Sequence, residues 1–447
     1  MLGFQCTRAS GRVLFKAMIN RWADRKNLRS RLLAFIASVL LLSVSSSCVI
    51  TQSSESQPAT PPPPSAPATA IPVVKPEVDI ASWYGEHDQD PETHAMLVET
   101  LAPGRVITSH NADKLFNPAS IIKLVTSLAA LRRLGPDYRF EVKVYADGTL
   151  DDRGVFHGQL YVMGGAPTFG DAAANMIAKE LRDMGVKRLD GTLNVSQDFC
   201  FNFSNSPEES AERLIKALKL EGAQPAAATS NAPAGEIVLT FYSHPLREVL
   251  LYMNAHSSNF TAERVGNLIG GPAAVQQFLI DELKLSPAEV QLSTVSGREQ
   301  NRMNARGIMT VLRALVDETR RHGMKPSDIL PVADEDNGTL RRRFTGSSLE
   351  GAVLGKTGTL TPEVDGGMVS LAGIVYTEDA GELAFVMLDQ GDRLAENRDA
   401  EDKLLEDVVR MRAQPRPVPI ETPRDLLSAS SMRVERRGAL QKGRKAA

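Results

Sequence analysis

Ser120 and Lys123 are two residues whose types and spacing suit covalent catalysis. They lie in the stretch NPASIIKLVTSLAALRRLG, residues 117–135. On a helix, residues three apart are neighbours on one face. A desolvated lysine favours its neutral amine, and a neutral amine beside a hydroxyl is a general base beside a nucleophile. The alternative is that Ser120 only caps a helix while Lys123 extends to solvent.

A helix expected from Ile121 onward must position this pair. Its apolar residues recur at helical spacing, and Gly135 followed by Pro136 predicts its end. Lys123 is the only charged residue between Ala119 and Leu131, and such an apolar helix belongs in a protein interior. The helix start also offers free backbone N–H groups that can stabilise an oxyanion.

A second motif, HSSN, interrupts two expected helices. Ser257 and Asn259 are two residues apart in a tight loop, where both side chains can face one cleft. A hydroxyl there can relay a proton, and an amide can hold a substrate amide. The alternative is a polar turn between helices.

The third motif, GKTGTL, lies on an expected strand. Lys356, Thr357 and Thr359 suit a carboxylate, and Gly358 lets a substrate backbone approach closely. The alternative is a strand end with a surface lysine.

Together, in this order, the three motifs form a specific set of the serine acyl-enzyme class. With the flanking segments FNPASIIKLVTSLAAL, SHPLREVLLYMNAHSSNFTAERV, DNGTLRRRF and LAGIVY, the chain resembles the D-alanyl-D-alanine carboxypeptidase/endopeptidase family of peptidase class S13, the penicillin-binding protein 4 type. The resemblance covers roughly residues 78–412.

The resemblance implies a role for each matching residue. Ser120 would be the acylated nucleophile and Lys123 its base, while Ser257 would pass a proton to the departing D-alanine with electrostatic support from Lys356. Asn259 would orient the peptide. Thr357 and Thr359 would hold the terminal carboxylate, beside Gly358, and the N–H groups of Ser120 and Thr359 would form the oxyanion hole. The expected partners are peptidoglycan stem peptides, with β-lactam antibiotics as covalent inhibitors.

The sequence also departs from the family pattern. Ser258 stands where Asp is usual in the second motif, and Ala166 replaces an acid in GGAPTF. The segment STVSGREQNRMN keeps only Ser296 and Gly297 of the usual Asp-Gly-Ser-Gly-Leu-Ser run. The spacing from Ser120 to Ser257 is shorter than usual, which predicts a reduced inserted subdomain.

The expected fold is α/β (α+β), a penicillin-binding-protein or serine β-lactamase-like sandwich of an antiparallel sheet and helices. Strands at both ends of the folded sequence, with helices between them, favour this arrangement. The expected domains are a signal sequence (1–47), a Pro/Ser-rich linker (48–77), a catalytic domain (78–414) with an insertion at about 140–240, and a basic, disordered tail (415–447).

The N-terminal segment predicts export to the cell envelope, the periplasm. Basic residues precede the apolar run Leu32–Val44, which is too short to span a membrane. Cys48 follows small residues, as at a lipoprotein processing site, and is a candidate for lipidation that would tether the protein to a membrane. A chance cysteine behind a cleaved signal is the alternative, so a soluble and a lipid-anchored form both stay open.

Composition and motifs argue against other function classes. A net charge of −3 and 5% aromatic residues disfavour a nucleic-acid partner. The seven histidines show no metal-binding spacing, so no metal and no cofactor are expected. A non-catalytic peptidoglycan-binding or scaffolding protein on the same fold, and a β-lactamase, remain as alternatives.

Overall fold

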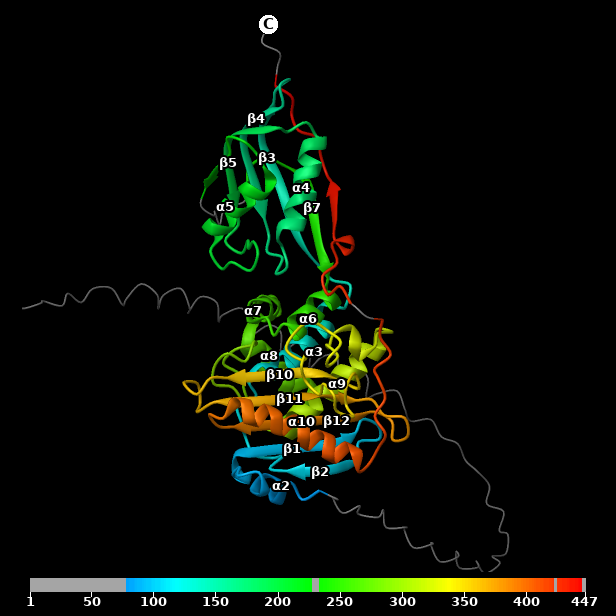
Figure 1. The fold of residues 1–447 in the computed structure, drawn as a ribbon. Coiled ribbons are helices and arrows are strands. Elements are labelled where there is room, and N and C mark those ends of the chain that lie inside the picture. The colour runs from blue at the N-terminus through cyan, green and yellow to red at the C-terminus, as the bar shows by residue number, and fades with distance from the viewer. Residues whose placement is uncertain (1–77, 227–232, 422–423, 444–447) are drawn as a thin grey trace, which may run out of the picture. The chain divides into compact units, whose positions relative to one another are not determined.

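The computed structural model describes residues 78–226, 233–421 and 424–443 (Figure 1). All of them belong to one unit of the chain, Pro72–Ala447. Among the described residues, no helix combines the length and the apolar character that crossing a membrane requires. The predicted signal sequence and linker lie outside the described residues, and so does Cys48.

An antiparallel sheet of five strands forms the centre of the fold. The strand order is β10-β11-β12-β1-β2, with bounds Val353–Leu360, Met368–Val375, Leu383–Gln390, His94–Thr100 and Val106–His110. Three of these strands come from the C-terminal part of the chain and two from the N-terminal part, as β1 pairs with β12 along its whole length. The five-stranded sheet can therefore form only when the two ends of the catalytic region come together.

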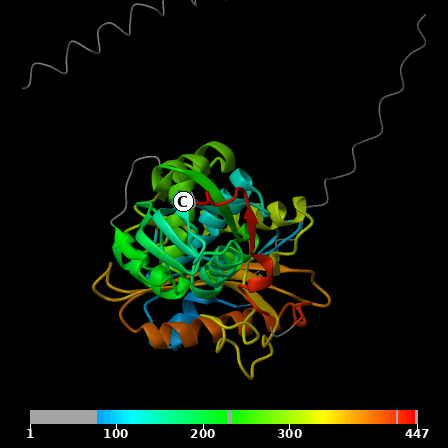
Figure 2. The same ribbon diagram turned by 90° about the horizontal axis from the view of Figure 1, so that it is seen from above.

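Alternate residues of the central strands face two separate hydrophobic cores. On β1, Leu97 packs in the core that contains helices α3 and α9, whereas Met96 packs in the core that contains α2 and α10. Side chains alternate between the faces of a strand, so a sheet covered on both faces must be apolar at every position. In Figures 1 and 2 the orange helix α10 lies across one face of the sheet, the face on which α2 also packs, while α3 and α9 pack on the opposite face.

Seven helices of the described residues surround this sheet, among them the helix that was expected from Ile121 onward. Helix α3 begins at Lys123, directly after the 3-10 turn Ala119–Ile122. The bounds are α2 Ile80–Glu86, α3 Lys123–Leu134, α6 Leu246–Ala255, α7 Asn259–Leu268, α8 Gly271–Leu283, α9 Ala305–Arg321 and α10 Leu394–Arg410.

Residues 139–245 form most of a second sheet, of six strands. Its order is β13-β7-β3-β4-β5-β6, and helices α4 and α5 contribute to its core. The bounds are β3 Arg139–Leu150, β4 Val155–Met163, α4 Asp171–Asp183, β5 Arg188–Val195, α5 Pro207–Leu218, β6 Gln224–Ala226, β7 Glu236–Pro245 and β13 Arg433–Arg436. Two short strands, β8 Val290–Gln291 and β9 Arg302–Met303, pair separately.

The prediction of a disordered tail over residues 415–447 was wrong for most of that segment. β13 pairs antiparallel with β7, with Val434 opposite Phe241, and Met432 is buried. An exposed edge strand offers unpaired backbone N–H and C=O groups. β13 pairs its backbone with the edge strand β7. The polar and basic side chains of the segment did not predict this pairing.

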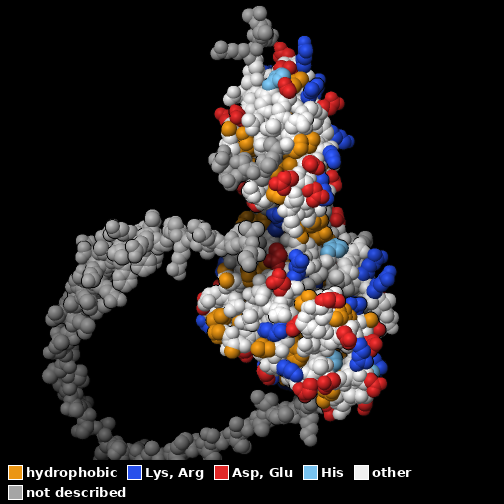
Figure 3. Space-filling view, turned by 90° about the vertical axis from the view of Figure 1, so that its left-hand side faces the viewer, with side chains coloured by type: hydrophobic (Ala, Val, Ile, Leu, Met, Phe, Trp, Pro, Cys, Tyr) orange, Lys and Arg blue, Asp and Glu red, His pale blue; other side chains and the backbone are white. Residues whose placement is uncertain are grey.

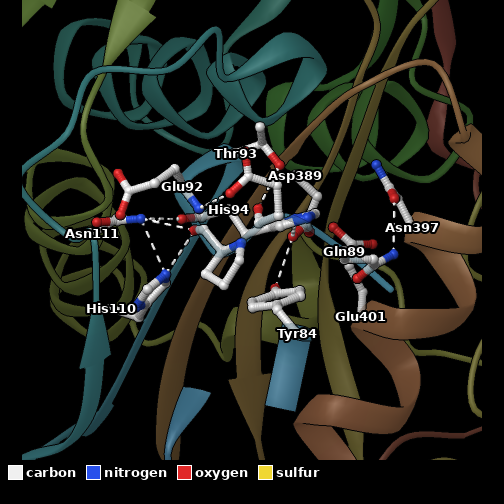
Figure 4. A network of polar contacts seen from close by, with 12 residues as sticks. Tyr84, Gln89, Glu92, Thr93, His94, His110, Asn111, Asp389, Asn397 and Glu401 are labelled. Carbon is white, nitrogen blue, oxygen red and sulfur yellow. Dashed lines mark hydrogen bonds and ion pairs between the residues drawn. The ribbon is translucent and has the colours of Figure 1, made fainter. Parts of the chain in front are cut away.

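A buried polar network joins four elements on the α10 side of the central sheet (Figure 4). Asp389 on β12 accepts hydrogen bonds from the Tyr84 hydroxyl at 2.8 Å and from His94 Nδ1 at 2.7 Å. The rings of Tyr84 and His94 stack at 4.0 Å. Glu401 on α10 accepts from Arg343 at 2.9 Å, and burial raises the pKa of Glu401 well above its usual range. The Asp389 contacts tie α2 to β1 and to β12, and the Gln89 amide, just after α2, donates to Asn397 Oδ1 on α10 at 3.1 Å.

Replacing Asp389 by Ala should lower the free energy of unfolding by about 2–4 kcal/mol, because the Tyr84 hydroxyl and the His94 ring would each lose a buried partner. Asp389→Asn keeps an acceptor oxygen and should cost less. Urea unfolding of the two variants measures this difference. Asp152→Ala, in an exposed turn, is the control and should stay within about 0.5 kcal/mol of the wild type. Equal unfolding midpoints for Asp389→Ala and Asp152→Ala would contradict the role of the network.

Candidate active site

Lys123 is the first residue of α3, and its side chain is fully buried, with 0% exposure. Its Nζ lies 2.9 Å from Ser120 Oγ, 2.7 Å from Asn259 Oδ1 and 2.6 Å from the carbonyl oxygen of Ser296. The structure therefore brings the first and second motifs together around one amine. It adds Ser296, which sequence reasoning noted only as a remnant of a family motif.

Burial lowers the pKa of Lys123 to about 7. Glu263 opposes this shift through its charge, and Arg298 adds to it. A neutral lysine amine has two N–H donors and one lone pair. Asn259 Oδ1 and the Ser296 carbonyl can only accept hydrogen bonds, whereas the Ser120 hydroxyl can donate one. In the neutral state, the lone pair is therefore left for Ser120 Oγ–H, the geometry of a general base beside its nucleophile.

The turn that carries Ser120 is held in a strained conformation. Ala119 has a φ of +51°, a region that residues with a side chain seldom adopt. Its N–H donates to Asn117 Oδ1 at 3.1 Å, and the Ser370 hydroxyl donates to the Pro118 carbonyl at 2.9 Å. These contacts fix the backbone on both sides of the bend, so the serine hydroxyl is presented in one place.

Two glycines pack against this turn, one that follows Ser296 and one on β10. A Cβ added to Gly297, which has a φ of +82°, would lie 2.0 Å from the Ala119 carbonyl oxygen. A Cβ added to Gly358 on β10 would lie 2.2 Å from Ser370 Oγ and 3.0 Å from the backbone N of Ser120. Gly358 is therefore required by the close approach of β10 to the nucleophile.

Lys356 and Ser257 form a second lysine–serine pair. Lys356 Nζ lies 2.9 Å from Ser257 Oγ and 2.6 Å from the Thr357 carbonyl oxygen. Burial lowers the pKa of Lys356 well below its usual range, and the charge of Lys123 lowers it further. Since two nearby ammonium groups repel each other, the site favours at most one charge on the two amines. Ser257 has a φ of +50° in the loop between α6 and α7.

Ser258, the residue that departs from the family pattern, has a structural role. It is the N-cap of α7, and its hydroxyl accepts a hydrogen bond from the Thr261 N–H at 3.2 Å. Ser and Asp are both favourable N-caps. This explains how Ser replaces the usual Asp without disturbing Asn259, the first residue of the helix.

The third motif lies on β10 and lines a cavity of about 420 Å³. Thr357 Oγ1 donates to Thr339 Oγ1 at 2.6 Å, which connects the motif to the DNGT turn. The cavity lining also contains cations that sequence reasoning did not assign. The lining residues are Thr339, Arg342, Arg343, Thr357, Gly358, Thr359, Arg398 and Asp399.

Among the predicted site residues, only Cys48 falls outside the described part of the chain. The residues that sequence reasoning missed are Ser296, Glu263, Thr339 and the cavity arginines. The retained Ser-Gly pair at 296–297 was the available signal for the first of these. Glu263 could not be found by motif, because it acts through a backbone contact: its Oε1 accepts from the Ser296 N–H at 3.1 Å. No cluster of three or more His, Cys, Asp or Glu suited to a metal ion occurs among the described residues.

The model of the D-Ala-D-Ala carboxypeptidase 3 (S13) family matches residues 82–205 and 200–408. The chain belongs to this family. Membership places it among serine hydrolases and agrees with the resemblance found from the three motifs. A D-alanyl-D-alanine carboxypeptidase from Actinomadura sp. (strain R39) is 33% identical over 99 residues, a match that spans 22% of this chain and 18% of that relative.

Solved structures share the fold at low sequence identity. A predatory endopeptidase from Bdellovibrio bacteriovorus, in complex with an immunity protein, is 22% identical with a TM-score of 0.63, covering 76% of this chain and 99% of the other. Penicillin-binding protein 4 from Haemophilus influenzae is 16% identical with a TM-score of 0.60, covering 74% and 99%. The predicted sandwich of an antiparallel sheet and helices is thus confirmed.

Replacing Lys123 by Met should slow acylation of Ser120 by at least about 10³-fold, because the base is lost while an apolar side chain of similar length fills the buried space. Lys123→Arg should be equally slow, since a guanidinium keeps the positive charge but does not release its proton near neutral pH. The rate of labelling by a fluorescent penicillin measures both. An Arg variant that acylates at the wild-type rate would contradict a proton-accepting role. Lys123→Ala also removes the base and should be as slow as Lys123→Met.

Proposed function

We propose that the protein is a serine-type D-Ala-D-Ala carboxypeptidase and DD-endopeptidase that acts on peptidoglycan stem peptides through a Ser120 acyl-enzyme. The observation that carries this proposal is the placement of Lys123 Nζ, with a pKa near 7, at 2.9 Å from Ser120 Oγ. A structural lysine at this position would need no serine partner and no desolvated amine. The family match and the resemblance of all three motifs supply the substrate class.

Acylation begins when Ser120 Oγ attacks the carbonyl carbon of the penultimate D-alanine. The hydroxyl proton passes to Lys123 Nζ as the C–O bond forms. The resulting oxyanion is assigned to the backbone N–H groups of Ser120 and Thr359, the pair that the family resemblance implies; β10 approaches the backbone N of Ser120 at Gly358. Asn259 keeps its amide N–H₂ for the substrate, because its Oδ1 is occupied by Lys123.

The leaving amine needs a proton when the C–N bond breaks. Ser257 is the assigned carrier, since its hydroxyl contacts Lys356 at 2.9 Å and can pass a proton to the departing nitrogen. The site then holds an ester between Ser120 and the acyl group of the substrate. The proton that Lys123 accepted from Ser120 then replaces the one that Ser257 donated. Water attacks the ester carbonyl, Lys123 accepts a proton from it, and that proton passes to Ser120 Oγ as the C–O bond breaks, which restores the serine and releases the acid.

The terminal carboxylate of the substrate is assigned to the cavity beside β10. The Thr357 and Thr359 hydroxyls, which donate to Thr339 Oγ1 and to the Gly358 carbonyl in this structure, would turn to donate to the carboxylate. The exposed Arg342 and Arg398 add positive charge. Arg343 contributes less, because it is buried and engaged with Glu401 and Asp402. A carboxylate fits this lining through charge-assisted hydrogen bonds.

Penicillins place a carboxylate and a strained amide in a similar arrangement, so the same groups would acylate Ser120 with the antibiotic. A structural neighbour, a predatory endopeptidase from Bdellovibrio bacteriovorus, was solved in its penicillin G-acylated form. The sequence between the second and third motifs contains no Glu-x-x-Leu-Asn-like deacylation motif. Slow release of the bound antibiotic is therefore part of the proposal, and rapid release would favour a β-lactamase.

The proposed place of action is the cell envelope. This part rests on the apolar run Leu32–Val44 behind basic residues and on Cys48 as a candidate lipidation site. A peptidoglycan substrate fits that location. On the face seen in Figure 3, Lys and Arg side chains are interspersed with Asp and Glu, without the broad basic surface that a nucleic-acid partner would favour.

Fluorescent penicillin labelling followed by peptide mapping tests the acyl-enzyme. The purified protein should carry the label on the peptide that contains Ser120, and Ser120→Ala should not be labelled. Equal labelling of the wild type and Ser120→Ala would overturn the assignment, and a complete lack of labelling would favour the scaffolding alternative.

Purified crosslinked muropeptides test the substrate. Mass spectrometry should detect loss of one alanine, conversion of dimers to monomers, or both, in the presence of wild-type protein, and neither with Ser120→Ala. Products identical in the two reactions would contradict peptidoglycan hydrolysis by this site.

A further inference from the structure

Thr339 lines the cavity beside β10, and the scheme above gives it no role of its own. It is the last residue of the DNGT turn, residues 336–339, and it is exposed. Thr357 and Thr359, the two threonines assigned to the substrate carboxylate, line the same cavity. The lining therefore contains three threonine hydroxyl groups rather than two.

The three hydroxyl groups differ in where their protons are engaged. The Thr357 hydroxyl donates to Thr339 Oγ1 at 2.6 Å, and the Thr359 hydroxyl donates to the Gly358 carbonyl oxygen at 2.8 Å. A threonine hydroxyl has one proton to donate, although its oxygen can also accept. The Thr339 oxygen accepts, and within the described ranges its own proton has no acceptor. Thr339 can therefore donate to a ligand without giving up an existing hydrogen bond, whereas Thr357 and Thr359 cannot.

The backbone of the DNGT turn is fixed against the end of α6. The Thr339 N–H donates to the Ala255 carbonyl oxygen at 2.8 Å. Gly338 has a φ of +148°, and a Cβ added to it would lie 2.2 Å from the same oxygen. Ala255 is the last residue of α6, two residues before Ser257. The turn is thus anchored to the helix that leads into the second motif.

A buried ion pair anchors the other side of the turn. The Asp336 carboxylate accepts from the Val332 N–H at 2.8 Å and from Arg424 Nε at 2.8 Å. Asp336 is buried, and Arg424 belongs to the C-terminal segment. Val332 forms a β-bridge with Leu354 on β10. Because the turn is anchored on both sides, a ligand pays little entropy to order the Thr339 backbone.

Two arginines of the lining draw an anion toward this hydroxyl. Arg342 and Arg398 are exposed, and neither guanidinium forms a hydrogen bond or ion pair with a residue that the structure describes. They outnumber the one acid of the lining, Asp399, even with Arg343 engaged by its own acidic partners. A carboxylate offers about four lone-pair sites, so it has room for a third hydroxyl donor.

We propose that Thr339 is a further substrate-binding residue, whose hydroxyl donates directly to the terminal carboxylate of the substrate. The inference rests on the proposed function, because it needs a substrate that places this carboxylate in the cavity beside β10. Thr339 supplies the donor that is free beforehand, and Thr357 and Thr359 add theirs by rotating their hydroxyl groups. When Thr357 turns in this way, Thr339 loses a hydrogen bond that it accepted but keeps its proton.

The test compares two inhibitors that differ only at the carboxylate: benzylpenicillin and its analogue with a carboxamide in that place. Competition with a fluorescent penicillin measures how fast each acylates Ser120 in the full chain. The nucleophile and the base act on both, so the ratio of the two rates reports recognition of the carboxylate. Thr339→Val should lower the acid-to-amide ratio about tenfold, as for one partly exposed charge-assisted hydrogen bond. Thr339→Ser keeps a hydroxyl and should stay within about threefold of the wild type.

A double variant separates direct contact from an effect that passes through Thr357. Thr339→Val also removes the present acceptor of the Thr357 hydroxyl. In a Thr357→Val background that acceptor no longer matters, so direct contact predicts that Thr339→Val still lowers the ratio severalfold. A residue that only positions Thr357 would have no effect in this background, and that result would overturn the proposal.

Thr310→Val is the matched control. It removes a threonine hydroxyl on α9 that donates to the Arg306 carbonyl oxygen, outside the cavity lining, and its ratio should equal that of the wild type. An unchanged ratio in Thr339→Val rejects the role of Thr339 alone, even where both rates fall together because the turn has loosened. No labelling of the wild type rejects the acyl-enzyme, and the inference with it.

Discussion

The removal of one lysine amine from water is the constraint on which the rest of the site depends. Lys123 is enclosed at the start of an apolar helix and faces two oxygens that can only accept, from Asn259 and Ser296, and one hydroxyl that can donate. Burial lowers the pKa to about 7, and the acceptors take the two N–H groups of the neutral amine. The remaining lone pair has one partner, Ser120. Burial thus lowers the pKa of the Lys123 amine, and the same contacts orient its lone pair toward Ser120.

The surrounding fold keeps that enclosure closed from several segments distant in sequence. Gly297 and Gly358 allow two backbones to press on the nucleophile turn, and Glu263 fixes the Ser296 backbone that holds Lys123. The five-stranded sheet places β10 at this point, and its first strand comes from the opposite end of the catalytic region. Packing therefore couples the geometry of the catalytic residues to the formation of the central sheet.

The sequence predicted the parts of the site that are local in the chain. Apolar periodicity around Lys123 predicted its burial, and motif spacing predicted the residues that meet at the amine. It could not predict Glu263 or the Ser296 carbonyl, because their roles depend on backbone groups brought together by tertiary structure. The ordered C-terminal segment was missed for a similar reason. β13 satisfies the edge of β7 through main-chain hydrogen bonds, while its side chains read as a solvated basic tail.

The pH dependence of Ser120 acylation tests the central claim most directly. The second-order rate constant for penicillin labelling should rise tenfold per pH unit below about pH 7 and level off above it, because only the neutral Lys123 amine accepts the proton. Controls at each pH establish that the protein stays folded. A midpoint near the ordinary lysine value of 10.5, or a rate that is flat from pH 5 to 9, would contradict a desolvated lysine as the base.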